Sequence, residues 1–290
     1  MPLSRAPSGT YVVPAGGPVS LGELPTASRQ RAGGEDAEQK AVADLADPLR
    51  RAHTLVIAHE SRGLLVVFQG MDASGKDEAI RDVLSAADAR GVATTQIKKA
   101  GGHDLRRPFL FRAVEAMPLR GQIGILNRSY YEDVVRTRVD PERLDEENLP
   151  DGAREHLWRT RYRQINDFEK LLAENGIAVL KLFMHVSKEV QRGRLLERID
   201  DPDKNWEFSE DDITARRHWD DYERAYDAAL AATSTAHAPW RVVPADRPWA
   251  ARAAVAREVV AALEALHDGF PAPEDPEMLA RAREALTSEG

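Results

Sequence analysis

Leu64-Leu-Val-Val-Phe-Gln-Gly-Met-Asp-Ala-Ser-Gly-Lys-Asp-Glu78 is the stretch that decides the fold of this chain. Its valine-rich apolar run is typical of a buried parallel strand, and it leads through Gly70 to Gly75 into a helix that we expect to begin at Lys76. The spacing G-x-x-x-x-G-K is that of a phosphate-binding loop, because glycines let successive backbone N–H groups converge on one anion. The following helix adds its positive N-terminal end, and Lys76 adds a full charge.

Two carboxylates make this loop unusual. Asp77 follows the lysine, where a magnesium-binding serine or threonine is usual, and Asp72 lies inside the loop. Asp72 is placed to hold Mg²⁺ directly or through water, so we predict it as the metal ligand. A strand–turn–helix joint without a ligand is the alternative, but the position of the motif directly after a strand favours phosphate binding. The predicted phosphate contacts in this loop are Gly70, Ala73, Ser74, Gly75, Lys76 and Asp77.

The composition is that of a globular chain with one substantial core. The 290 residues are 42% apolar and 30% charged, and they include no cysteine, which excludes disulfides and thiolate metal sites. No apolar run approaches the length of a membrane span, and the N-terminus lacks a signal-peptide pattern, so we expect a cytoplasmic protein without a membrane partner. The net charge of −8 argues against a nucleic-acid partner.

Basic residues gather in one part of this acidic chain. From Lys98 to Arg143 there are ten Lys and Arg residues against six Asp and Glu residues. Such a reversal of sign hints at a polyanionic ligand. On charge alone, however, an ordinary patchy surface is the simpler explanation.

Five apolar runs alternate with helical patterns between residues 36 and 270. Because this alternation requires crossover connections, it predicts an α/β fold with a five-stranded parallel sheet and helices on both faces, a three-layer sandwich like that of P-loop kinases. A polar helix–loop–helix at about 187–222 lies where small kinases of this topology carry a helical lid. The predicted strands are a run from Leu64, then 92–98, 122–126, 177–186 and 240–243, and the predicted helices are 35–59 (kinked or split by Pro48), 76–88, 105–117, 152–175, 187–198, a helix from Ser209, and 249–267.

The two ends of the chain differ from this domain. Residues 1–35 are rich in proline, glycine and serine and lack periodicity, so we expect a poorly ordered arm, draped over the domain or over a neighbouring subunit. Residues 271–290 form a predicted C-terminal tail, in which Asp275 would cap a short charged helix that begins at Pro276.

Polar clusters follow two further strands. In open α/β sheets ligands lie beyond the carboxyl ends of the strands, so the segment 127–133 should face the same crevice as the phosphate loop. Arg194 and Arg198 share a face of the helix after the fourth strand, and two guanidinium groups on one face can clamp phosphate oxygens. The alternative is a solvated helix face on which Glu189 and Glu197 pair with these arginines.

With these residues in place, the sequence resembles the polyphosphate kinase 2 family. The matching stretches are Phe68-Gln-Gly-Met-Asp-Ala-Ser-Gly-Lys-Asp77, Gly121-Gln-Ile-Gly-Ile-Leu-Asn-Arg-Ser-Tyr-Tyr-Glu-Asp-Val134, the segment from Gln191 to Trp206, and Ala236-His-Ala-Pro-Trp240 followed by Val243-Pro-Ala-Asp246. Together they span about residues 40–265, most of the chain.

The resemblance implies Mg²⁺-dependent phosphoryl transfer between inorganic polyphosphate and a nucleotide, with Mn²⁺ as an alternative metal. Asn127 with Glu132 and Asp133 looks like the class III branch, which phosphorylates AMP as well as ADP. We expect adenine nucleotides as substrates, with guanine nucleotides as a further candidate, and a homodimer or homotetramer. The implied catalytic residues are Asp72, Lys76, Asn127, Arg128 and Glu132. The implied polyphosphate contacts beyond the loop are Arg194, Arg198 and Lys204, and the implied nucleotide contacts are Lys98, Arg112, Arg128, Tyr131 and Glu132. For Tyr131, packing in the core is the alternative.

The chain departs from the family pattern at three places. Glu207 follows the lid tryptophan, where the family usually has a lysine, and Tyr130 stands where class III often has a histidine. The segment from Lys99 to Pro108 also replaces a more regular acidic one. These departures bear on the range of substrates and on the grip on polyphosphate more than on the type of reaction.

Two other functions fit the same motifs. An ATP-dependent nucleoside or nucleotide monophosphate kinase would share the fold and differ in its donor. A nucleotide-binding regulator would bind tightly without turnover, although Lys76 and the charged crevice favour an enzyme. The preferred acceptor, the favoured direction and the preferred polyphosphate length stay open at this point.

Overall fold

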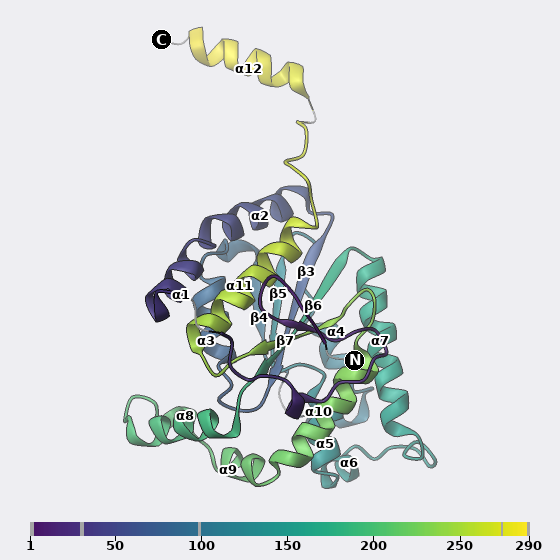
Figure 1. Ribbon diagram of the computed structural model, residues 1–290. Coiled ribbons are helices and arrows are strands. Elements are labelled where there is room, and N and C mark those ends of the chain that lie inside the picture. Colours follow the sequence, from purple (N-terminus) through teal and green to yellow (C-terminus); the bar gives the residue numbers. More distant parts are fainter. Residues whose placement is uncertain (1–2, 30–31, 98–99, 274, 289–290) are drawn as a thin grey trace.

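The apolar runs of the sequence form the centre of a seven-stranded sheet in the computed structural model, which describes residues 3–29, 32–97, 100–273 and 275–288. The order across the sheet is β1-β2-β7-β6-β3-β5-β4, and Figure 1 labels the five strands from β3 to β7. Each neighbouring pair among β4, β5, β3, β6 and β7 is parallel. The bounds are β3 Gly63–Gly70, β4 Val92–Thr95, β5 Ile123–Asn127, β6 Ile177–His185 and β7 Trp240–Pro244.

Strand β3 lies in the middle of the sheet, and every residue of it is buried. It pairs with β5 through Leu64 and Ile123 and with β6 through Gly63 and Ile177. A strand buried on both faces needs an almost continuous apolar sequence, as this one has. The loop that follows β3 therefore leaves the sheet at the carboxyl edge, between the ends of β5 and β6.

The N-terminal arm is ordered, which corrects the prediction for residues 3–29. Strand β1 (Ser4–Arg5) pairs antiparallel with β2 (Tyr11–Val12), and β2 pairs antiparallel with β7, so the sheet is mixed rather than purely parallel and has two more strands than predicted. Val13 and Leu21 of the arm are buried in the core, and Leu21 begins the short helix η1 (Leu21–Glu23). The arm is thus draped over the domain, and backbone pairing with β7 supplies the order that its own sequence does not.

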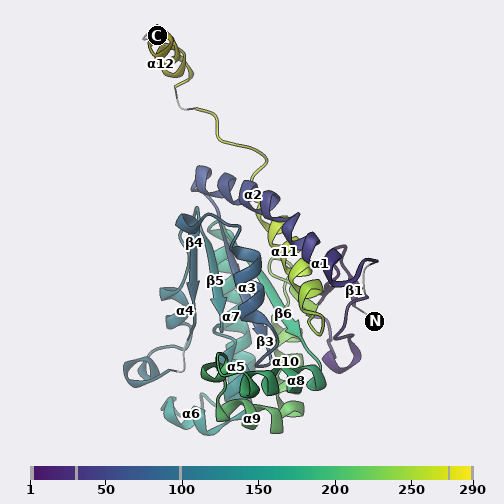
Figure 2. The ribbon, with the colours of Figure 1, turned by 90° about the vertical axis from the view of Figure 1, so that its left-hand side faces the viewer.

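Helices cover both faces of the sheet, as Figure 2 shows from the side. Helix α11 contacts β3, β6 and β7 and also α1, α2 and α3, so these four form one layer. On the other face α7 packs on β6, and α5 and α10 pack on α7. The bounds are α1 Gly34–Ala43, α2 Ala46–His59, α3 Lys76–Leu84, α5 Glu132–Val139, α7 Leu157–Glu174, α10 Trp219–Thr233 and α11 Pro248–Glu264.

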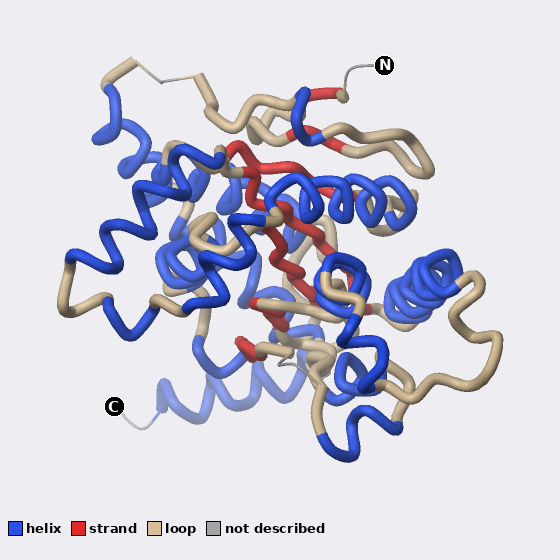
Figure 3. The backbone as a smooth tube through the Cα atoms, turned by 90° about the horizontal axis from the view of Figure 1, so that it is seen from below, coloured by secondary structure: helices blue, strands red, loops and turns tan. Residues whose placement is uncertain are grey.

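The predicted lid consists of α8 (Lys188–Asp200), η4 (Asn205–Glu207) and α9 (Glu210–Arg217), seen from below in Figure 3. The Ser187 side chain caps α8 by accepting a hydrogen bond from the Val190 N–H group, as predicted. Ser209 and Asp212 form a capping box at the start of α9. The single helix predicted from Ser209 is wrong, because α9 ends at Arg217 and α10 begins at Trp219, with His218 between them.

Several helix boundaries also differ from the prediction. The predicted helix 105–117 is two pieces, η3 (Gly102–Arg106) and α4 (Phe111–Glu115), with Pro108 between them. The predicted helix 35–59 divides between α1 and α2, upstream of Pro48, which lies in the first turn of α2, where a missing N–H group costs little. The remaining helices are η2 (Ala89–Gly91), α6 (Glu142–Glu146) and α12 (Pro276–Ser288).

Helix α12 stands apart from the body at the end of an extended segment (Figure 1). The Asp275 carboxylate caps it as predicted, since Oδ1 accepts a hydrogen bond of 2.8 Å from the Met278 N–H group. None of the residues of α12 is buried. Among the described helices, none combines the length and the apolar character needed to cross a membrane.

Candidate active site

The loop at residues 70–76 connects β3 to α3 through three residues with positive φ. Gly70 has a φ of 148°, Ala73 of 58° and Gly75 of 93°. A Cβ atom at Gly70 would lie 2.6 Å from the Met184 carbonyl oxygen, so only glycine fits beside β6. Ala73 adopts a left-handed conformation that L-residues other than Asn and Asp rarely use, which is typical of functional loops.

Lys76 lies folded over this loop. Its Nζ donates hydrogen bonds to the carbonyl oxygens of Gly70 and Met71, both at 3.0 Å, and to Ser74 Oγ at 3.2 Å. Burial lowers the pKa of Lys76, while the carboxylates of Asp72 and Glu132 oppose that fall. An anion bound in the loop would add a negative charge beside Nζ and so favour the charged form of the lysine.

The carboxyl end of β5 brings the second predicted cluster to the same loop. Asn127 is buried, and its Nδ2 donates a hydrogen bond to Asp77, so it ties β5 to the start of α3. Arg128 has a φ of 72°, and its half-exposed guanidinium lies 3.7 Å from Asp72 Oδ1. Glu132 begins α5. The predicted catalytic residues therefore do lie together.

Two adjoining pockets lie on the β5 side of the loop, and they share Arg128, Glu132 and Arg136; we call them together the β5-side pocket. The inner part reaches Asp72 and Lys76, while the outer part has apolar walls as well as charged groups. The inner part is lined by Gly70, Met71, Asp72, Lys76, Arg128, Glu132, Arg136, Ala215, Tyr222 and Tyr226. The outer part is lined by Ile97, Ala100, Leu105, Arg112, Arg128, Glu132, Asp133, Arg136, Thr137, Arg143, Glu146 and Glu147.

A third pocket, the lid-side pocket, lies on the opposite side of the loop, between α3, α8, η4 and the start of α11. Residues 73–75 of the loop form one wall, so this pocket reaches the other side of the same backbone. Five cations and three acids line it. The lining residues are Ala73, Ser74, Gly75, Glu78, Arg81, Met184, Arg194, Glu197, Arg198, Lys204, Glu207, Ala245, Pro248, Ala251 and Arg252.

The two lid arginines line this pocket in different ways. Arg194 donates from Nη1 to the Ala73 carbonyl at 3.0 Å and from Nη2 to the Ala245 carbonyl at 2.7 Å, so it braces the loop against the end of β7. Arg198 instead pairs with Glu207. The predicted phosphate clamp is therefore not formed by two equivalent guanidinium groups. The alternative, in which Glu189 and Glu197 form ion pairs with these arginines, is not found among the described residues either, since Glu189 pairs with Arg192.

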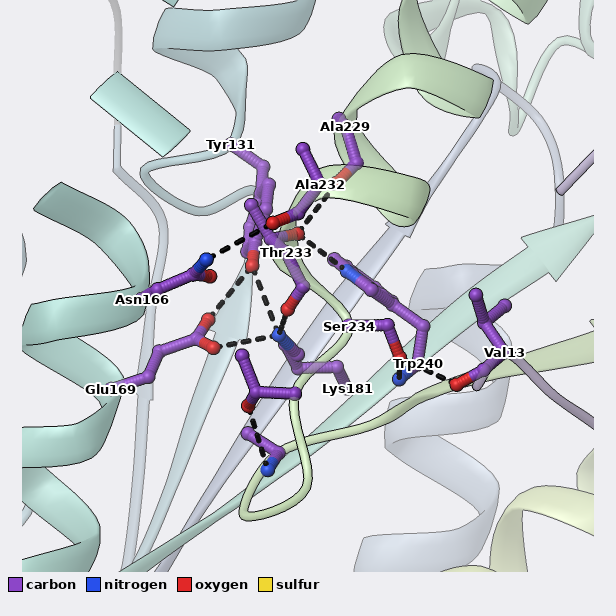
Figure 4. A network of polar contacts seen from close by, with 12 residues as sticks. Val13, Tyr131, Asn166, Glu169, Lys181, Ala229, Ala232, Thr233, Ser234 and Trp240 are labelled. Atoms are coloured by element: carbon purple, nitrogen blue, oxygen red, sulfur yellow. Dashed lines mark hydrogen bonds and ion pairs between the residues drawn. The ribbon is translucent and has the colours of Figure 1, made fainter. Parts of the chain in front are cut away.

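Tyr131 is buried in the core, which corrects its prediction as a nucleotide contact (Figure 4). Its hydroxyl donates a hydrogen bond of 2.8 Å to Glu169 Oε1 and accepts one of 3.2 Å from Lys181 Nζ. Its ring packs edge-on against Trp240. After Arg128 the chain turns inward, so the side chains of Tyr130 and Tyr131 point into the core, toward Glu169 of α7, and away from the pockets.

The other predicted nucleotide contacts divide as follows. Arg112 lines the β5-side pocket and holds both carboxylate oxygens of Asp133 at 2.9 Å. Burial raises the pKa of Asp133 to about 6, although Arg112 and Arg161 pull it down. Lys98 lies outside the described residues. Lys204, predicted as a polyphosphate contact, lies 3.4 Å from Asp201 and lines the lid-side pocket.

Four arginines of the pockets were missed by the sequence predictions, among them Arg143 in the outer part of the β5-side pocket. Arg136 lines both parts of the β5-side pocket, and Arg81 and Arg252 line the lid-side pocket. Arg136 follows Glu132 by four residues, so the two share a face of α5. That spacing could have revealed Arg136 if a helix had been predicted over 132–139.

No group of three or more His, Cys, Asp or Glu side chains forms a ready metal cage among the described residues. Asp72 is partly exposed and faces Arg128 and Lys76. One carboxylate beside a phosphate loop fits Mg²⁺, which usually keeps its waters and takes its other ligands from phosphate oxygens.

The family model of polyphosphate kinase 2 matches residues 33–270 of this chain. The chain belongs to the polyphosphate kinase 2 family. It is 38% identical over 263 residues to an ADP-polyphosphate phosphotransferase from Rhodopseudomonas palustris, covering 90% of this chain and 91% of that protein. It is 40% identical over 242 residues to an AMP/ADP-polyphosphate phosphotransferase from Meiothermus ruber, covering 83% and 87%.

A solved polyphosphate kinase 2 from Arthrobacter aurescens has the same fold. It superimposes with a TM-score of 0.84 at 33% sequence identity and covers 94% of this chain and 93% of its own. The resemblance predicted from the loop and the β5 signature is therefore confirmed.

Proposed function

We propose that this polyphosphate kinase 2 transfers phosphoryl groups reversibly between inorganic polyphosphate and adenine nucleotides, from AMP to ADP and from ADP to ATP. The observation that carries the proposal is the pair of charged pockets on the two sides of one loop. Two substrates bound in them would meet at Asp72 and Lys76. The names of the relatives from R. palustris and M. ruber support the same reaction.

We assign the β5-side pocket to the nucleotide and the lid-side pocket to polyphosphate. The outer part of the β5-side pocket offers apolar walls, Ile97 and Leu105, for a base, and Arg112, Arg128 and Arg136 for phosphates. The lid-side pocket offers loop backbone and cations, as a chain of phosphates requires. A core of parallel strands with a phosphate loop at its carboxyl edge also supports a kinase of the P-loop type.

Phosphoryl transfer requires positioning and positive charge more than covalent help from the protein. Lys76 and Arg128 would face the transferred group from two sides, and their cationic groups would counter the charge on its oxygens. Asp72 would hold Mg²⁺, or Mn²⁺ in its place, and the metal would counter the negative charge of the phosphates. Asn127, anchored on Asp77, would keep the end of β5 against the loop.

The test is a turnover assay with the protein, Mg²⁺, long-chain polyphosphate and either AMP or ADP. We expect ADP from AMP and ATP from ADP. Replacing polyphosphate by ATP as the donor to AMP or to a nucleoside separates this function from that of an ATP-dependent kinase. Nucleotide binding without any product would support the regulator and overturn the proposal.

We predict that Asp72→Ala and Lys76→Ala each lower kcat at least about 100-fold, because both groups act on charge that develops in transfer. Measurements of kcat at saturating polyphosphate and ADP check this. Lys170→Ala, on the exposed side of α7, is the matched control and should keep its activity. Retention of full kcat by Lys76→Ala would contradict the assigned role of the loop.

We also expect a homodimer or homotetramer in the cytoplasm. Light scattering after size-exclusion chromatography would give the subunit number.

A further inference from the structure

The lid-side pocket contains acids as well as cations. One of the acids, Glu207, pairs with Arg198, which the sequence predicts to bind polyphosphate. Glu207 Oε2 lies 3.3 Å from Arg198 Nε, and both residues line the pocket. The Arg198 side chain is 15% exposed and comes from α8, whereas that of Glu207 is 34% exposed and comes from η4. The Glu207 carboxylate thus forms an ion pair with the Arg198 guanidinium inside the pocket.

The other cations of this pocket are held differently. Arg194 donates to backbone carbonyls, and Arg81 and Arg252 both pair with Asp82, which does not line the pocket. Lys204 pairs with Asp201, also outside the lining. Within the described residues, Arg198–Glu207 is the one ion pair with both partners in the pocket wall.

The charge of Glu207 also reaches the opposite wall. The pKa of Arg81, on α3, is raised first by its hydrogen bond to Asp82 and to a smaller degree by Glu207. The Glu207 carboxylate therefore acts mainly on Arg198 of the lid and only weakly on Arg81 of α3. Carboxylate and phosphate oxygens accept the same guanidinium hydrogen bonds, so the two anions would compete for one site.

We propose that Glu207 is an internal competitor of the polyphosphate donor, and that a donor phosphate binds Arg198 only by displacing this carboxylate. The residue therefore weakens the hold on the donor and sets the concentration of phosphate chain that the enzyme needs. Because η4 is a three-residue helix at the protein surface, the carboxylate can move aside without unfolding a larger element. The inference rests on the proposed function, since it assigns the lid-side pocket to the donor.

The test compares steady-state kinetics of the wild type with Glu207→Gln, which keeps the shape of the side chain and removes its charge. We expect KM for polyphosphate to fall about fivefold, as for the loss of one competing ion pair of moderate exposure. KM for ADP should not change. The KM for polyphosphate should also rise more steeply with salt in Glu207→Gln, because the donor then meets one more uncompensated cation.

Two further variants separate competition from a general charge effect. Glu189→Gln removes the same charge from an exposed position on α8, outside the pocket, and should leave KM for polyphosphate unchanged. In an Arg198→Gln background, Glu207→Gln should bring no gain, because the contested guanidinium is gone. An equal gain with and without Arg198 would overturn the proposal.

A structural role for the ion pair gives a different result. If Glu207 only holds the lid, Glu207→Gln would lower the thermal midpoint and kcat and would raise KM for polyphosphate, which also overturns the proposal. Wild-type turnover with polyphosphate is measured in the same experiment. Absence of that turnover would refute the proposed function itself, whereas normal turnover with an unchanged KM in Glu207→Gln would refute only this inference.

Discussion

At the scale of single residues, a buried polar network decides which side chains near Arg128 can meet a substrate. Lys181 on β6 and Glu169 on α7 are fully buried and lie 2.6 Å apart, and Lys181 also donates to the Thr233 carbonyl (Figure 4). Burying two charges is costly, and pairing with extra hydrogen bonds offsets that cost. The hydroxyls of Tyr130 and Tyr131 complete the set by donating to Glu169. The network thus anchors the segment between Arg128 and Glu132 to the buried Glu169 of α7.

We predict that Tyr131→Phe leaves KM for the nucleotide unchanged and lowers the free energy of unfolding by about 1–2 kcal/mol, because only the two buried hydrogen bonds of the hydroxyl, to Glu169 and from Lys181, are lost. Denaturant unfolding and steady-state kinetics check the two parts. Arg112→Gln provides the contrast, since it changes the pocket wall and should raise KM for the nucleotide. A large rise of that KM in Tyr131→Phe would restore the tyrosine as a binding residue.

At the scale of elements, the sequence predicted the strands and helices whose signals lie within their own residues. The run from Leu64, the fourth apolar run and the Ser187 cap are strong local signals, and the structure has β3, β6 and α8 there. Strand β2 was not predictable, because two residues carry no period and their partner is β7.

The site was predicted in part, for similar reasons. The motif spacing located Asp72 and Lys76, and the end of a strand located Arg128. Nothing local says that Tyr131 turns inward, since its partners Glu169 and Lys181 come from distant elements. Without a predicted helix at α5, Arg136 could not be placed on a face.

His53 links two elements and gives the fold a dependence on pH. Its Nδ1 accepts a hydrogen bond from the Asp88 N–H group and its Nε2 lies 3.2 Å from the Gly91 carbonyl, so the neutral ring joins α2 to η2. Burial lowers the pKa of His53 below 6.5. The unfolded chain therefore binds the proton more readily, and stability falls as pH drops below about 6.5.

We predict that the free energy of unfolding decreases less between pH 7 and pH 5 in His53→Gln than in the wild type, because glutamine cannot take up the proton. At pH 7 the variant should be less stable, since a buried ring is lost. Urea titrations at several pH values measure both effects. Identical pH slopes for the two proteins would show that the ring does not resist protonation.

At the scale of the whole molecule, α12 is separate from the working domain. The family model ends at residue 270, and none of the residues of α12 is buried. Just before that point, the rings of His267 and His59 stack 4.0 Å apart and the His59 ring hydrogen-bonds to the Gly269 carbonyl.

We therefore predict that removing residues 271–290 leaves the thermal midpoint, kcat and both KM values unchanged. Differential scanning calorimetry and the turnover assay check this on the truncated chain beside the full one. A lower midpoint after truncation would mean that α12 packs on the body in solution.

The arm at the other end of the chain finishes one side of the sheet. Without β2, the backbone of β7 would offer a free row of N–H and C=O groups on which a strand of another molecule could align. With the arm in place, the outermost strand is β1, which is two residues long and carries Arg5. So short and charged a border gives a neighbouring molecule little to extend, which makes residues 3–12 a safeguard against aggregation as well as a part of the fold.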